Sequence, residues 1–119
     1  MLLAVLMLGA TMLGATTIAG LLMAYQIRQV TNFSDSAKSV FAADAGAEWA
    51  LNAYFQQSSA PMIPFSNNAS ATVVCYDASG TQTPSCTATS SAYGVSVGMA
   101  GGTERAFLAD FSGATGTLP

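Results

Sequence analysis

The closest pair of groups in this sequence that could do chemistry is Asp44 and Glu48. Their i, i+4 spacing places both carboxylates on one face of a helix, where like charges repel each other mildly. The pair could accept a cation or a basic group of a neighbouring molecule, or it could belong to a solvated polar stripe. No nucleophile or third partner accompanies the two acids, so we expect no catalysis and no enzyme.

Cys75 and Cys86 are the only thiols, and the sequence contains no histidine. A metal site needs more ligands than two cysteines, so we expect no metal and no cofactor. Two cysteines in a small exported domain most often pair. Closing this short loop would add about 2–3 kcal/mol in the chain-entropy description. Two buried free thiols are the alternative.

The overall composition points to self-association. Of the 119 residues, 51% are hydrophobic and only 8% are charged, whereas globular chains average about 25% charged residues. Such scarcity of charge suggests a protein that meets other copies over most of its surface. The basic residues Arg28, Lys38 and Arg105 lie far apart in the sequence, so the charge footprint of a nucleic-acid-binding protein is missing.

The segment from Met1 to Val30 is a long apolar run that would anchor the rest of the chain. Its first charged residue is Arg28, and an apolar run of this length can cross a bilayer as a helix. It is either an ordinary membrane anchor or a segment that leaves lipid and packs against copies of itself. Between Gly14 and Gly20, glycines and β-branched residues make the helix most prone to loosen. The side chains expected to form a filament core are Leu2, Leu3, Val5, Leu6, Leu8, Leu13, Ile18, Leu21 and Leu22.

The flanks of the apolar segment bear on processing. No Lys or Arg precedes it, so Met1 is either an initiator or the first residue after a removed basic leader. We expect the second, with Met1 as the processed N-terminus. Arg28 alone would keep the following chain inside the cell, whereas the cysteines indicate the outside. A removed basic leader resolves this conflict.

The helical pattern continues beyond the apolar segment. Apolar residues recur every three or four positions, which is typical of an amphipathic helix packed on a partner. We predict one helix from about residue 2 to Gln57, after which Pro61 and Pro64 forbid its continuation. The predicted stripe is Val30, Phe33, Ala37, Phe41, Ala45, Trp49 and Ala53.

Two motifs in this helix carry a resemblance to a known family. Phe41 to Phe55 reads FAADAGAEWALNAYF, and LLAVL stands at Leu2 to Leu6. The chain thereby resembles bacterial type IV pilins and pilin-like proteins, most of all the PilX-type minor pilins, over about residues 2–55. The resemblance implies a prepilin peptidase, a methylated mature N-terminus, polymerisation through the helix and display outside the inner membrane.

Position 5 departs from the family pattern. Most major pilins have a glutamate at the fifth mature position, which partners a neighbour's N-terminal amine. Here the residue is Val5, and no acid occurs before Asp35. The departure indicates a minor or divergent pilin.

The remaining chain reads as β structure. Thr72–Tyr76, Ser85–Ser90, Ala92–Gly98 and Arg105–Phe111 are predicted strands, with turns at Asp77–Gly80 and Gly101–Gly102. We therefore expect an α+β fold, in which a small antiparallel sheet packs on the second half of a long N-terminal helix.

The predicted divisions are a hydrophobic helix at 1–27, its amphipathic continuation at 28–57 and a β-rich domain at 58–119. The predicted core comprises Trp49, Leu51, Tyr54 or Phe55, Val74, Val95, Val97 and Phe107.

These features favour a structural subunit of a helical filament of the type IV pilus class. The expected partners are identical subunits, the inner membrane before assembly, and the peptidase and pilus assembly machinery, with no specific nucleic acid. The expected location is the inner membrane and then the extracellular pilus. The alternatives are a single-pass membrane protein with a small extracytoplasmic binding domain, and a pseudopilin of a type II secretion system.

Overall fold

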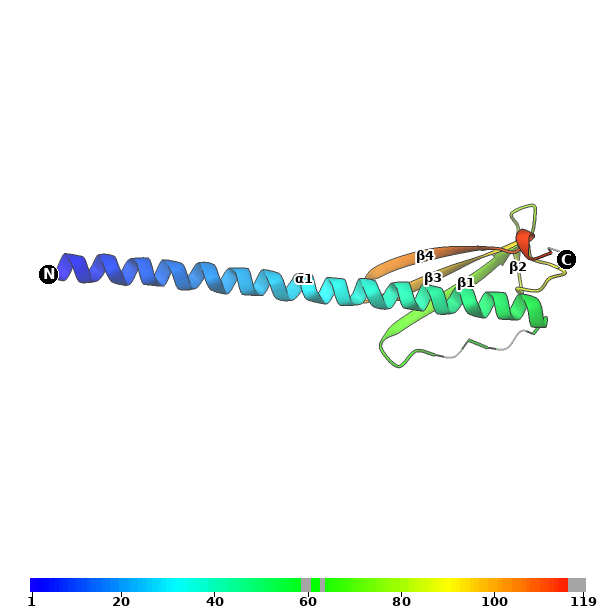
Figure 1. Cartoon of the computed structure of the whole chain (residues 1–119), viewed down its shortest axis with the longest axis horizontal. Coiled ribbons are helices and arrows are strands. Elements are labelled where there is room, and N and C mark those ends of the chain that lie inside the picture. The colour runs from blue at the N-terminus through cyan, green and yellow to red at the C-terminus, as the bar shows by residue number, and fades with distance from the viewer. Residues whose placement is uncertain (59–60, 63, 116–119) are drawn as a thin grey trace. The chain divides into compact units, whose positions relative to one another are not determined.

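The computed structural model describes residues 1–58, 61–62 and 64–115. Helix α1 spans Leu2–Gln56, and the chain forms two compact units, Met1–Phe33 and Ser34–Pro119. The first unit is the N-terminal part of α1. The second contains the rest of α1, four strands and a short 3-10 helix (Figure 1). The helix ends one residue before its predicted boundary, where Gln57 takes a positive φ of 50°, as residues that terminate helices often do.

The four strands form one antiparallel sheet in the order β2-β1-β3-β4. Their bounds are β1 Ala69–Tyr76, β2 Gln82–Thr83, β3 Tyr93–Ala100 and β4 Thr103–Asp110, followed by the 3-10 helix η1, Ser112–Thr115. The α+β class and the antiparallel sheet are as predicted from the sequence. The predicted strand at Ser85–Ser90 is wrong, because that stretch is a loop next to the disulfide and the short second strand precedes it.

The turn between β3 and β4 follows from its two glycines. Ala100 pairs with Thr103, which leaves only Gly101 and Gly102 in the loop. Both have positive φ, 53° and 88°. A two-residue hairpin of this kind needs positive φ at both central positions to match the twist of its strands, and glycine takes it without steric cost.

The second half of α1 packs on one face of the sheet through very small residues. On β3 the buried residues alternate and are Gly94, Ser96, Gly98 and Ala100. Ser96 Oγ donates a hydrogen bond of 2.7 Å to the Ala43 carbonyl. A Cβ atom built on Gly98 would collide with the backbone of Ser39 and Ala43. The strand and the helix therefore approach each other at backbone distance.

This close approach corrects the predicted helix stripe. The prediction placed large side chains such as Phe41 toward the partner, but Phe41 is 73% exposed. The sheet-facing positions are small because a large side chain would hold the two backbones apart. Of the predicted stripe only Ala53 is buried; the buried helix residues are Ser39, Ala42, Ala43, Gly46, Ala50, Ala53 and Tyr54.

The predicted core needs the same correction. Tyr54 is buried as predicted, with Phe55 the exposed alternative. Val95 and Val97 lie on the face of β3 that points away from the helix, and pair with Val74 and Thr72 on β1. Trp49 and Val74 are only partly buried, and Leu51 and Phe107 are exposed. One core cluster comprises Ala50, Ala53, Tyr54, Cys75, Cys86 and Phe111, and a second comprises Ala42, Ala69 and Ala100.

Candidate assembly surface

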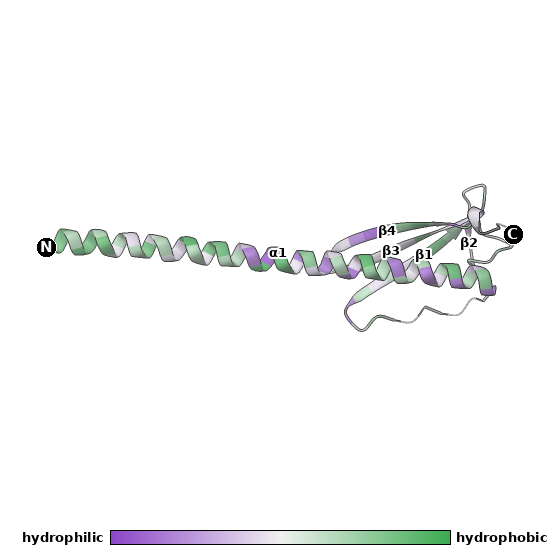
Figure 2. Cartoon of the chain, viewed as in Figure 1, coloured by the Kyte–Doolittle hydropathy of each residue, from purple (hydrophilic) through white to green (hydrophobic). Residues whose placement is uncertain are grey.

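The N-terminal unit exposes its entire apolar surface. Every residue from 1 to 33 is exposed, and Figure 2 shows the apolar colouring along this part of α1. Soluble monomers rarely expose contiguous apolar patches of more than a few hundred Å², so such a surface indicates a lipid or protein environment. All the predicted filament-core side chains lie on it. Their exposed fractions are Leu2 79%, Leu3 74%, Val5 72%, Leu6 64%, Leu8 66%, Leu13 70%, Ile18 61%, Leu21 72% and Leu22 59%.

The threonines in this unit do not break its apolar character. Thr11 donates its hydroxyl hydrogen bond to the Leu8 carbonyl at 2.9 Å. Thr16 and Thr17 donate to the carbonyls of Leu13 and Gly14, at 3.0 Å and 2.9 Å. Hydroxyls satisfied within their own helix need no water. The unit is therefore compatible with lipid and with burial against other helices.

Three glycines leave positions without a side chain on the same apolar helix surface. Nothing lies within 4 Å of a Cβ atom built on Gly9, Gly14 or Gly20. The helix runs without interruption through Gly14–Gly20, so loosening of this segment stays a prediction. Small residues on an apolar helix allow a second helix to come close.

Length and composition make α1 a candidate membrane anchor. It is the one helix, among the residues that the structure describes, long and apolar enough to span a bilayer. Its apolar window contains none of the buried residues of the fold. Met1 lies fully exposed at the end of this helix.

The predicted acidic pair lies on the second half of α1. Asp44 and Glu48 are both exposed, and neither has an ion pair or side-chain hydrogen bond with another described residue. The ion pair found among the described residues joins Lys38 Nζ to Asp35 Oδ1 at 3.9 Å. The two acids are therefore open to a partner, and a contact with another subunit remains a prediction.

A groove beside Glu48 was not foreseen from the sequence. It has a volume of about 400 Å³ and runs between α1 and the described residues of the connection to β1. Trp49 and Phe65 are its aromatic lining residues, and Glu48 is the only charged one. Pro64 and Phe65 in a polar loop were the signal, since an apolar pair in a connection often packs on the preceding element. The full lining is Ala45, Glu48, Trp49, Asn52, Met62, Pro64 and Phe65.

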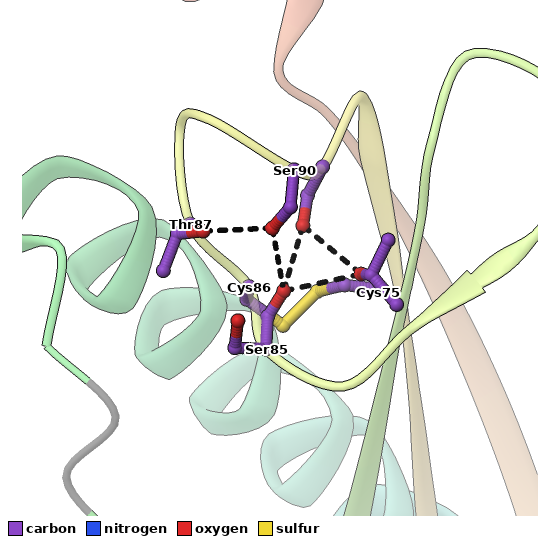
Figure 3. Close-up of a disulfide and its surroundings, with 7 residues drawn as sticks. Cys75, Ser85, Cys86, Thr87 and Ser90 are labelled. Atoms are coloured by element: carbon purple, nitrogen blue, oxygen red, sulfur yellow. Dashed lines mark hydrogen bonds between the residues drawn. A yellow bond between two sulfur atoms is a disulfide. The ribbon is translucent and has the colours of Figure 1, made fainter.

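The cysteines form the predicted disulfide. Cys75 on β1 and Cys86 in the loop between β2 and β3 lie with their Cα atoms 5.4 Å apart, and both are buried in the larger core cluster. Three hydroxyls converge on the Ser85 carbonyl beside the bridge, from Thr83, Ser90 and Ser91. Figure 3 shows this network around the bridge. The loop is thus tied to the core both covalently and by hydrogen bonds.

Asp77 and Asp110 accept hydrogen bonds that stabilise local turns. Hydrogen bonds from the Ser79 hydroxyl and then the Thr81 amide lower the pKa of Asp77, whose Oδ1 accepts them at 2.6 Å and 2.8 Å. Hydrogen bonding from Ser112 lowers the pKa of Asp110 in the same way. Donors aimed at a carboxylate stabilise its charged form. Within the described part of the chain, no three histidine, cysteine or acidic residues lie together as metal ligands would.

A long apolar N-terminal helix, a small antiparallel sheet and a disulfide are together compatible with a pilin-like fold. No protein-family model, curated protein or solved structure matches this chain.

Proposed function

We propose that this chain is a structural subunit of an extracellular helical filament of the type IV pilus class, which polymerises through its apolar N-terminal helix. The observation on which this proposal rests is that residues 2–33 lie in helix α1 and that all their large apolar side chains are exposed. Burying each such side chain contributes about 1.5–3 kcal/mol. A helix of this composition therefore gains most when every one of its faces is covered.

The proposed path begins in the inner membrane and ends in the filament. Lipid covers the helix before assembly, and other subunits cover it afterwards. The disulfide supports an extracytoplasmic place for the second unit, because such bonds persist in oxidising compartments. A prepilin peptidase and pilus assembly machinery are the proposed processing partners, and adhesion or motility would follow from the filament.

The rival is a single-pass anchor whose helix stays in lipid. The filament subunit and the membrane anchor differ in whether they need the glycines of the N-terminal helix. In a filament, Gly9 and Gly14 let neighbouring helices approach, whereas lipid tails adapt to any apolar side chain. Gly14→Leu keeps the helix apolar and meets nothing within its own chain, so it should leave membrane insertion intact.

The experiment compares wild type with Gly9→Leu, Gly14→Leu and the control Met7→Leu. Sheared cell-surface material is sedimented and imaged by negative stain, and membrane-bound protein is quantified in parallel. The proposal expects wild-type fibres about 5–8 nm wide, as bundled helices of about 10–12 Å diameter would give. It also expects reduced fibre yield for the glycine variants only. Wild-type protein found in detergent-soluble membrane but never in fibres would establish the anchor instead.

A further inference from the structure

The groove beside Glu48 has the chemistry of a site for a flat cation. Its carboxylate is the only charge among the lining residues, and Trp49 and Phe65 supply aromatic surface. Guanidinium groups stack on aromatic faces and bind carboxylates at the same time, which a compact ammonium does less well. An arginine with apolar neighbours fits this lining better than a small hydrated ion does.

The chain itself supplies one arginine without an acidic partner in an apolar setting. Lys38 contacts Asp35, and Arg105 donates to Ser36 Oγ at 3.3 Å. Arg28 has neither an ion pair nor a side-chain hydrogen bond among the described residues. Tyr25 lies one turn before Arg28 on the same face of α1 and is 66% exposed, so a surface that covers this face covers Arg28 as well.

A covered arginine must find an acid. Removing a guanidinium from water costs several kcal/mol unless a carboxylate and further hydrogen bonds compensate. Asp35 already contacts Lys38, while Asp77 and Asp110 accept hydrogen bonds within their own turns. Asp44 and Glu104 are exposed, and neither lines the groove beside Glu48. Glu48 is the acid that combines a free carboxylate with an apolar, aromatic groove.

We propose that Arg28 of one subunit enters this groove on a neighbouring subunit, with its guanidinium on Glu48 and stacked against Trp49 or Phe65. This inference rests on the proposed filament and identifies one of its contacts. The pairing fixes which part of the apolar helix lies beside the second unit of its neighbour. It gives an electrostatic register to an assembly otherwise held by non-directional apolar contacts.

The test exchanges the two charges. Arg28→Glu and Glu48→Arg are each expected to lower fibre yield at least about tenfold, since each variant brings two like charges together in the groove. The double variant is expected to recover most of the yield. The matched control combines Arg28→Glu with Glu104→Arg, which restores the same net charge at an exposed acid outside the groove and should not recover fibres.

Co-assembly of two cysteine variants provides a second measurement. Chains with Arg28→Cys and chains with Glu48→Cys are mixed in fibres and treated with a short bifunctional thiol reagent. Cross-linked dimers are expected for this mixture and not for Arg28→Cys with Glu104→Cys. Wild-type fibres with neither charge-swap recovery nor cross-linking would overturn the pairing alone. Recovery by the Glu104→Arg combination would overturn it too, as a net-charge effect. A wild-type chain that forms no fibres would overturn the proposed function, and the pairing with it.

Discussion

Among the possible glycine-to-alanine substitutions in the second unit, we expect Gly98→Ala to lower the free energy of unfolding the most. The new Cβ would collide with the Ser39 carbonyl oxygen and the Ala43 amide nitrogen of α1. Both are backbone atoms, so no rotamer change can relieve the collision. The part of α1 that packs on β3 through small side chains, around Ser39 and Ala43, must therefore move away from the strand.

The cost can be worked from the contacts in this interface. Overpacking typically costs about 1–3 kcal/mol, and the upper end applies where backbone must shift. Moving the helix also stretches the 2.7 Å bond from Ser96 to the Ala43 carbonyl, which contributes about 1 kcal/mol. We therefore expect a loss of about 3–4 kcal/mol in the free energy of unfolding. For a unit of this size that lowers Tm by more than about 10 °C, at about 4–8 °C per kcal/mol.

Thermal unfolding of the full chain in detergent micelles, followed by Trp49 fluorescence, measures this shift. In Gly46→Ala the new methyl group meets the Ser96 hydroxyl, which can rotate away at the cost of its bond to the Ala43 carbonyl. Because no backbone must shift and alanine has the higher helix propensity, the Tm of Gly46→Ala should fall less than that of Gly98→Ala. Gly113→Ala meets nothing within 4 Å and is the matched control. A Tm for Gly98→Ala within about 2 °C of that control would refute the backbone-distance contact between strand and helix.

Three further outcomes follow from the same structure. Replacing Cys75 and Cys86 together by serine should cost about 3 kcal/mol, as expected for a closed loop of this length, measured by urea unfolding of the full chain. Truncating the buried ring of Phe111, which stacks on Tyr54 with centroids 4.5 Å apart, to alanine should cost about 3–5 kcal/mol in the same assay. Asp77→Asn should destabilise the turn at neutral pH. Because the folded pKa of Asp77 is lowered, its stabilisation is present above the ordinary value of about 3.8 and is lost as pH falls through the lower folded pKa. The difference between wild type and Asp77→Asn should therefore vanish in acid.

Local patterns with strong physical constraints were predictable from the sequence. The long helix follows from an apolar run and a continued 3.6-residue period, with no proline before Pro61. The β3–β4 turn follows from Gly101 and Gly102, and the disulfide follows from two cysteines on either side of a turn. Each of these features depends on a few neighbouring residues, so a single sequence suffices.

The choice of the buried face was not predictable by the same reasoning. The alternation along β3 was read correctly, but the larger set, Val95 and Val97, was assigned to the core. Gly94, Ser96 and Gly98 face the helix instead. Burial of large apolar groups is the usual guide, and it fails where close backbone approach replaces side-chain contact. The groove beside Glu48 escaped prediction for a related reason, since it depends on how a connection returns along α1.

The second unit completes its core without help from the first. Both core clusters are built from residues beyond Phe33, and none of residues 1–33 is buried. The core clusters of the second unit, among the described residues, therefore contain no side chain of the first. A surface of that composition would be selected against in a soluble monomer, because it promotes association. Its presence beside a disulfide-closed unit with its own core supports the proposed role of the N-terminal helix, which is association with lipid first and with other subunits afterwards.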